Sequence, residues 1–118
     1  NTDVAVAHPF ESIYRARALI VQRQVKTLPV IDDERRVIGV LSIIDLFTRD
    51  LVEWETVDSI MRSDVTTISA ETPVADLVST MTTEGYKNVP VVDDDGRLVG
   101  MITRGELIAV LHRALLGA

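Results

Sequence analysis

An internal duplication constrains the fold of this chain more than any other feature. Sliding the sequence by 61 positions superposes residues 28–47 on residues 89–108 without a gap, and most apolar positions exchange with apolar residues. Each copy alone is too small to bury much core, so we expect the two copies to pack together. The positions that are identical in both copies are, in the first copy, Pro29, Val30, Asp32, Asp33, Arg36, Gly39 and Leu46.

Each copy predicts the same opening series of elements. An alternating segment at residues 4–7, and again at 65–68, suits a half-buried strand. A helix is expected next, and its apolar spacing is clearest after residue 73. Two β-rich segments around a polar turn then predict a hairpin, at residues 28–41 in the first copy and 89–102 in the second.

A final helix is expected from Ser42 to about residue 52, and from Thr103 to about residue 116. A helix that bridges two strands favours a parallel pair, whose sheet needs helical cover. We therefore expect a mixed α/β (α+β) fold of tandem β-α-β-β-α repeats with pseudo-two-fold symmetry, their sheets packed between the repeats and flanked by helices. We expect residues 1–53 to form the first repeat, without a lead-in like that of the second. We expect residues 54–118 to form the second repeat, which includes the connecting segment 54–64.

Composition excludes several classes of function. The chain has no cysteine, which rules out disulfides and thiolate metal sites and favours a cytoplasmic setting. Its net charge of −6 argues against nucleic-acid binding. The apolar stretches are too short to span a bilayer, so we expect no direct membrane contact. His8 and His112 lie in dissimilar contexts, so we expect neither a metal site nor catalytic residues.

The sharpest motif is GVLSIID at residues 39–45, which is echoed by GMITRGE at residues 100–106. A strand that leads directly into a helix favours an anion at the helix start, and the acidic residue could accept hydrogen bonds from ribose hydroxyls. The same spacing, Ser-x-x-Asp or Thr-x-x-Glu, also fits a helix capping box that needs no ligand. The motif alone leaves both interpretations open.

The order and duplication of these motifs resemble the CBS-domain pair, a family named after cystathionine β-synthase. The resemblance rests on LPVID at 28–32 and VPVVD at 89–93, each followed by the motif above, and on the lead-in DSIM at 58–61. It implies a regulatory module that is not an enzyme and needs no cofactor. Such modules bind AMP, ADP, ATP or S-adenosylmethionine between two repeats, control an attached or associated effector, and often form homodimers.

The resemblance also implies which residues contact the ligand. The carboxylates of Asp45 and Glu106 would hold the ribose hydroxyls, and Ser42 and Thr103 would lie near the ribose or the phosphate. Basic residues would face the phosphate, and backbone groups would flank the base. The expected phosphate residues are Lys26, Lys87 and Arg104, and the expected base residues are Val6, Thr67, Leu28, Pro29, Val89 and Pro90.

The two sites are not expected to be equal. Glu106 replaces the family's usual aspartate, and its extra methylene would either bring the carboxylate too close to a ribose or turn it into the capping role. The Asp45 site therefore fits the family pattern better. The alternative function is a ligand-free module that dimerises or assembles a larger protein. Hydrolysis by Asp45 and Glu106 is disfavoured because no nucleophile or metal set accompanies them.

Overall fold

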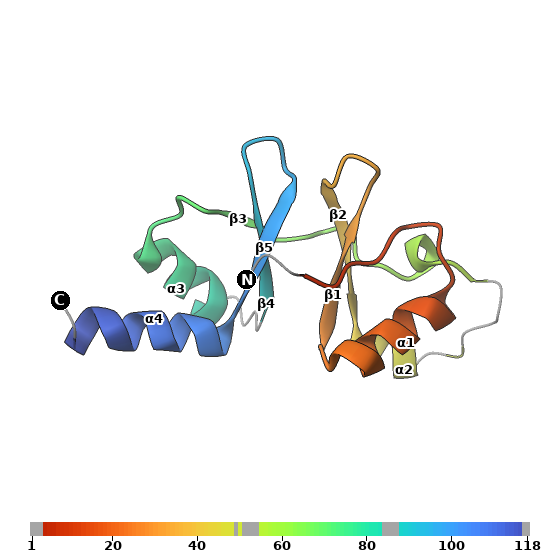
Figure 1. Cartoon of the computed structure of the whole chain (residues 1–118), viewed down its shortest axis with the longest axis horizontal. Helices are drawn as coiled ribbons and strands as arrows, with labels where there is room; N and C mark the ends of the chain where they lie inside the picture. Colours follow the sequence, from red (N-terminus) through yellow and green to blue (C-terminus); the bar gives the residue numbers. More distant parts are fainter. Residues whose placement is uncertain (1–3, 49, 51–54, 84–87, 117–118) are drawn as a thin grey trace.

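The computed structural model describes residues 4–48, 50, 55–83 and 88–116 (Figure 1). The elements of the first repeat are helix α1 (Ile13–Arg23), strands β1 (Thr27–Ile31) and β2 (Val37–Ser42), and helix α2 (Ile43–Thr48). A short 3-10 helix, η1 (Val57–Ser59), lies in the connection. The elements of the second repeat are β3 (Ile68–Ser69), α3 (Val74–Thr83), β4 (Asn88–Val92), β5 (Leu98–Thr103) and α4 (Arg104–Leu116).

Strand pairing repeats along with the sequence. Strands β1 and β2 form an antiparallel hairpin, as do β4 and β5, and both hairpins have a register shift at equivalent positions. Strand β3 adds in parallel to β4. In the first repeat the expected opening strand is reduced to a bridge at Ala7, which donates to the Pro29 carbonyl (2.9 Å) and accepts from the Ile31 amide (3.0 Å).

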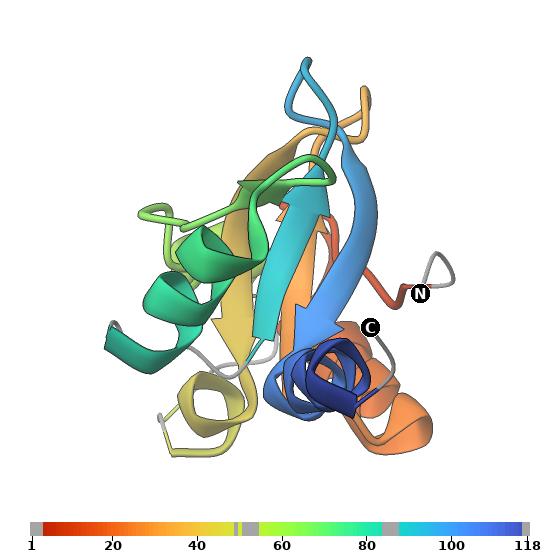
Figure 2. The same cartoon turned by 90° about the vertical axis from the view of Figure 1, so that its left-hand side faces the viewer.

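The two small sheets lie side by side in the middle of the molecule, with α1 and α2 outside one and α3 and α4 outside the other (Figure 1). Both hairpin turns are at the same end (Figure 2). The first repeat has its own apolar core, to which η1 contributes Val57, and the second repeat has a smaller core around Met81 and Val89. The expected fold of two repeats with flanked sheets is therefore confirmed.

The repeats pair directly where the two hairpin turns meet. The Val37 amide donates to the Gly96 carbonyl (3.1 Å), and the Leu98 amide donates to the Arg35 carbonyl (2.8 Å). The 61-residue offset relates Val37 to Leu98 and Arg35 to Gly96, so each bond is the equivalent of the other. The pseudo-two-fold axis therefore passes between them. Arg35 and Gly96 both have a positive φ, of 64° and 81°, which glycine adopts without cost and arginine rarely adopts.

Helix α2 is shorter than expected. It ends at Thr48, and Asp50 lies outside any helix, whereas the prediction extended to about residue 52. Arg17 of α1 gives a physical reason, because its Nη2 atom donates to the Leu46 carbonyl (2.6 Å). In a longer helix that carbonyl would accept the amide of Asp50. A side chain from the neighbouring helix therefore caps α2 where the motif alone predicts continuation.

Candidate functional site

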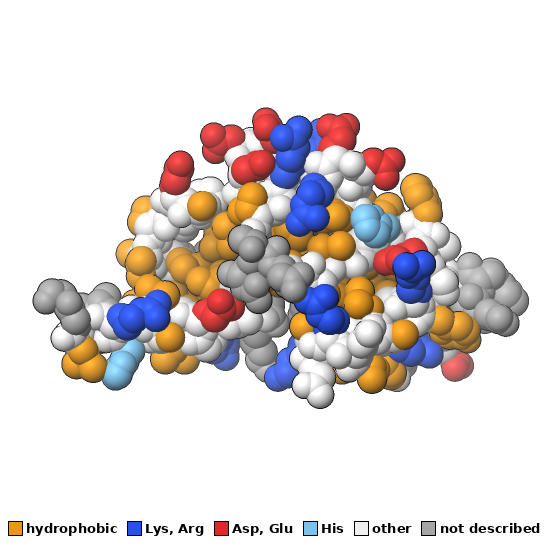
Figure 3. Space-filling view, viewed as in Figure 1, with side chains coloured by type: hydrophobic (Ala, Val, Ile, Leu, Met, Phe, Trp, Pro, Cys, Tyr) orange, Lys and Arg blue, Asp and Glu red, His pale blue; other side chains and the backbone are white. Residues whose placement is uncertain are grey.

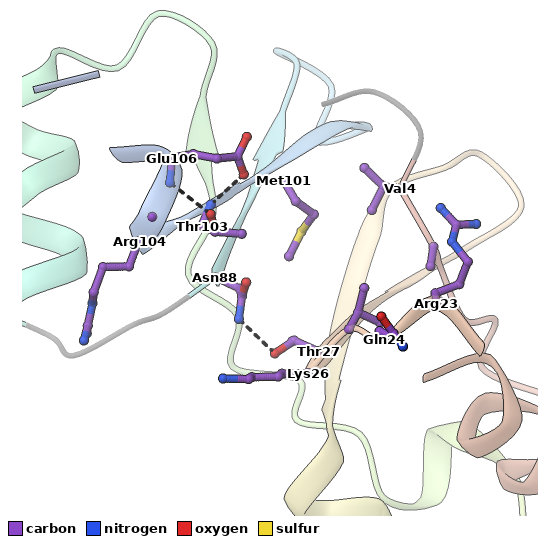
Figure 4. A pocket seen from close by; sticks show the side chains of 13 residues that line it. Val4, Arg23, Gln24, Lys26, Thr27, Asn88, Met101, Thr103, Arg104 and Glu106 are labelled. Atoms are coloured by element: carbon purple, nitrogen blue, oxygen red, sulfur yellow. Dashed lines mark hydrogen bonds between the residues drawn. The ribbon is translucent and has the colours of Figure 1, made fainter. Parts of the chain in front are cut away.

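A cavity of about 680 Å³ lies between the two repeats (Figure 4). The first repeat lines it with residues 4–5 and 23–27. The second repeat lines it with Asn88, Met101 and residues 103–106. These residues lie at the opposite ends of the strands from the hairpin turns. The volume is within the range of small-molecule sites in proteins.

The end of α1 positions the first wall of the cavity. Gln24 adopts the left-handed conformation (φ 53°), and its amide donates to the Ile20 carbonyl, which stops the helix. The chain then turns into β1, so that Arg23 and Lys26 are presented at the cavity. The Lys26 carbonyl accepts the Ile43 amide (2.9 Å), which anchors this turn to the start of α2.

The start of α4 positions the second wall. Thr103 and Glu106 form a reciprocal capping box: the Glu106 amide donates to Thr103 Oγ1, and the Thr103 amide donates to Glu106 Oε1, each at 3.1 Å. Of the two outcomes expected for the extra methylene of Glu106, the structure has the capping one. The box engages Oε1 and leaves Oε2 of this exposed carboxylate for another donor.

The cavity has an apolar part and a polar part. Its apolar lining is Val4, Ala5, Val25 and Met101. Figure 4 shows the side chains of Val4 and Met101 directed into the space between the repeats, with Glu106 at one edge and Lys26 at the other. Between the repeats, Asn88 Nδ2 donates to Thr27 Oγ1 (3.4 Å), and these two residues are equivalent by the 61-residue offset.

Ser42 and Asp45 lie at the equivalent position of the first repeat and do not line this cavity. Asp45 is buried, with 8% of its surface exposed. Its Oδ2 accepts the Ser42 hydroxyl (2.9 Å), and its amide donates to Ser42 Oγ (3.2 Å). Arg62 Nε is 3.5 Å from the same Oδ2, because the connecting segment pairs with Val40 of β2. Asp45 is therefore held by internal partners in this structure.

The remaining sequence-predicted residues are distributed over the molecule. The residues that the cavity brings together are Lys26, Thr103, Arg104 and Glu106. Val6 lines a separate hollow with His8 and Glu11, and Thr67 is exposed on the way into β3. Lys87 lies outside the described residues. The strand residues Leu28, Pro29, Val89 and Pro90 are buried, so they could offer a ligand only backbone groups.

Several lining residues were not predicted from the sequence. These are Val4, Ala5, Arg23, Gln24, Val25, Thr27, Asn88, Met101 and Gly105. The duplication carried a signal for two of them, because Thr27 and Asn88 directly follow the equivalent lysines Lys26 and Lys87. No periodicity marks residues 4–5 and 23–25, since they line the same cavity as the start of α4 only through the packing of one repeat on the other.

Acidic side chains gather over the hairpin turns, away from the cavity (Figure 3). In the first turn, the backbone amide of Arg36 is the main reason why the pKa of Asp32 lies below its ordinary value, and the Glu34 amide and the Arg36 guanidinium add to this effect. Within the described parts of the chain, no group of three or more His, Cys, Asp or Glu residues could hold a metal ion. None of the helices there is long and apolar enough to cross a membrane.

Comparison with known proteins decides the family. The CBS domain model matches residues 1–51 and 57–113. The chain belongs to the CBS domain family. Among curated relatives, the choline transport ATP-binding protein OpuBA of Bacillus subtilis is 29% identical over 99% of this chain, and CBSX1 of Arabidopsis thaliana is 26% identical over 90%. The chain spans 30% of OpuBA and 58% of CBSX1, so this CBS pair corresponds to part of each.

Solved structures of CBS pairs share the whole fold. CBSX2 from Arabidopsis thaliana, in complex with AMP, has a TM-score of 0.87 and 28% identity, covering 96% of this chain and 90% of that chain. The CBS domain pair of protein MJ0100, in complex with 5′-methylthioadenosine and S-adenosyl-L-methionine, has a TM-score of 0.80 and 27% identity, covering 95% of this chain and 93% of that chain. Enzymes such as the L-aspartate semialdehyde sulfurtransferase of Methanocaldococcus jannaschii match this chain over 20% of their length.

Proposed function

We propose that this CBS pair is a regulatory module that binds an adenine nucleotide or S-adenosylmethionine in the cavity between its repeats. The observation that carries the proposal is a cavity built from both repeats, with an apolar part and a carboxylate at its edge. The ligands of the related CBSX2 and MJ0100 structures support it. The module itself catalyses no reaction in this proposal.

The lining residues suggest how the ligand lies. An adenine ring would fit between Met101 and Val4, where a polarizable thioether and a methyl-rich side chain face each other. The Oε2 atom of Glu106 would accept a ribose hydroxyl, and Lys26 would face a phosphate. A ligand in this position contacts both repeats at once. It therefore favours one relative orientation of the repeats, to the extent that it binds that orientation more tightly. This difference in binding free energy is what the module passes to an attached or associated effector.

The region around Ser42 and Asp45 is proposed as the second site, with Lys87 and Thr67 as its further members. There the ion pair between Arg62 and Asp45 must open before Asp45 can accept a ribose. The backbone near Val6, Leu28, Pro29, Val89 and Pro90 would contribute to the base subsites. This site costs more to occupy, because the ligand has to replace an existing partner.

Thermal melting with AMP, ADP, ATP and S-adenosylmethionine tests the proposal. A ligand at about 100 times its Kd stabilises the native state by about 2.7 kcal/mol, which raises Tm by about 10 °C for a domain of this size. Glu106→Gln retains the capping box and the fold but weakens the acceptor, so it should reduce the shift. Glu71→Gln, an exposed change remote from the cavity, should leave the shift unchanged. A flat series with all four ligands would favour the ligand-free assembly module.

We also propose that the module is a homodimer in a cytoplasmic setting. Large apolar side chains are exposed on the outer helices of both repeats, among them Phe47 (50%), Ile108 (59%) and Leu115 (82%). Pairing of two copies would remove such surface from water. Light scattering after size-exclusion chromatography should give twice the 13.0 kDa chain mass, and a monomer at all concentrations would contradict the homodimer.

A further inference from the structure

We infer that Met101 is a site of reversible oxidation by hydrogen peroxide, and that its sulfoxide weakens ligand binding in the cavity between the repeats. The oxidation site follows from the sequence and the geometry, whereas the effect on the ligand rests on the function proposed above. Together they make the module respond to peroxide as well as to its ligand.

Methionine is the residue type through which peroxide can modify this chain reversibly. The chain has no cysteine, so the thiol that ordinarily reacts with peroxide is absent, and it has three methionines. These are Met61, Met81 and Met101. Peroxide reacts with a thioether according to how accessible its sulfur is. The surroundings of the three sulfurs therefore decide which one is oxidised.

The three methionines differ in what their side chains contact. Met81 is fully buried in the core of the second repeat, with 0% of its surface exposed. Met61 packs against the core of the first repeat, and its Sδ atom lies against Gly39. Met101 is partly exposed and lines the cavity, and Figure 4 shows its side chain directed into the space between the repeats. The cavity therefore gives peroxide a route to Met101, whereas core packing holds the other two.

The reaction is a two-electron oxidation of the thioether by peroxide. The sulfur lone pair attacks one peroxide oxygen, so that an S–O bond forms as the O–O bond breaks. The leaving hydroxide takes up the proton of the transferred oxygen and departs as water. The product is a sulfoxide, which methionine sulfoxide reductases convert back to the thioether. The equivalent position of the first repeat is Val40, which has no atom that reacts in this way.

Oxidation changes the apolar part of the cavity, which Met101 forms together with Val4, Ala5 and Val25. A sulfoxide is polar where the thioether is apolar. In the ligand-free protein, water in the cavity can hydrate the new oxygen, so oxidation costs the fold little. A ligand ring packed on Met101 removes this water and leaves the oxygen among side chains that carry no donor. The sulfoxide therefore disfavours the bound state more than the free state, which lowers the affinity.

Peptide mass spectrometry of the native chain during exposure to hydrogen peroxide tests the oxidation site. Met101 should be oxidised first and Met81 last, with rate constants that differ by about tenfold or more. AMP should slow the oxidation of Met101 and leave the rate at Met61 unchanged, because Met101, unlike Met61, lines the cavity. Earlier oxidation of Met61 or Met81, or equal rates at all three, would overturn the assignment of Met101.

Calorimetric titration of AMP before and after peroxide treatment tests the effect on binding. Oxidation should weaken AMP binding by about tenfold, which corresponds to about 1.4 kcal/mol, and a methionine sulfoxide reductase should restore it. Each variant is compared with itself, so its own starting affinity does not enter. Met101→Leu should bind AMP equally before and after peroxide. Met61→Leu, the matched removal of a methionine outside the cavity, should lose affinity as the native chain does.

The possible results separate this inference from the function on which it rests. An oxidised chain that binds AMP as tightly as the untreated chain would overturn the effect on binding. A loss of affinity that persists in Met101→Leu would overturn the role of Met101. Absence of binding by AMP, ADP, ATP and S-adenosylmethionine before any peroxide would overturn the proposed function, and the effect on the ligand with it. The order of methionine oxidation is measured without ligand, so it does not depend on that outcome.

Discussion

Gly39 is predicted to be required by a close approach between the connecting segment and β2. A Cβ atom at this position would lie 2.6 Å from Met61 Sδ, 3.1 Å from Met61 Cγ and 3.0 Å from the Arg62 carbonyl oxygen. Gly39→Ala must therefore displace the Met61 side chain, the Arg62 backbone or both. Moving the backbone would break the two 2.9 Å hydrogen bonds between Val40 and Arg62.

The magnitude follows from these two costs. Overpacking of this kind costs about 1–3 kcal/mol, and loss of the two backbone bonds costs about as much. The lower entropy of the unfolded chain offsets about 0.4–1 kcal/mol of this. These terms give about 1–6 kcal/mol, so we expect Gly39→Ala to destabilise the protein by about 3 kcal/mol, which lowers the urea midpoint by about 1.5 M.

Gly105→Ala is the matched control. Gly105 is the second residue of α4, and a Cβ there would meet nothing closer than Thr103 Oγ1 at 3.9 Å. Alanine in a helix is favoured over glycine by about 0.5–1 kcal/mol, so this variant should be slightly more stable than the native chain. The same substitution is therefore expected to lower the stability at Gly39 and to raise it at Gly105. A Gly39→Ala protein as stable as the native one would refute the close-approach argument.

Two further predictions concern the α4 start and the first hairpin turn. Thr103→Ala should cost about 1 kcal/mol of unfolding free energy while Thr103→Ser retains most of it, because only the hydroxyl caps the Glu106 amide; equal midpoints for both variants would contradict the capping box. The carboxyl pKa of Asp32, followed by carbon NMR, should titrate below 3.8, because the folded state lowers it. The stabilisation from Asp32 is then present above its ordinary pKa and is lost as the pH falls through the lowered value. The native chain should therefore have a larger free energy of unfolding than Asp32→Asn at neutral pH, and this difference should disappear in acid. A difference that does not change with pH would contradict the prediction.

The sequence predicts the parts of this fold that depend on local pattern and repetition. The 61-residue offset gives both hairpins their common register, and it carries over to the shared register shift and to the facing pair Thr27 and Asn88. The early end of α2 could not be read from its motif, because the Arg17 side chain that caps Leu46 comes from another helix. The periodicity of apolar residues does not indicate which side chain of one helix binds the backbone of another.

The sequence predicts two sites, one around Asp45 and one around Glu106, and both remain predictions. Motif matching favours the Asp45 end, since an aspartate fits the family pattern, yet the described cavity lies at the Glu106 end. Two contacts hold Asp45 in the structure. Arg62 and Ser42 engage Asp45, and neither contact follows from the motif, because Arg62 belongs to the connection and reaches Asp45 only when that segment pairs with β2.

A crystal structure of this chain grown with AMP tests the central claim most directly. The account predicts adenine between Met101 and Val4, the ribose at Glu106 and the phosphate toward Lys26. A fully occupied AMP bound elsewhere on the molecule, with this cavity empty, would contradict it.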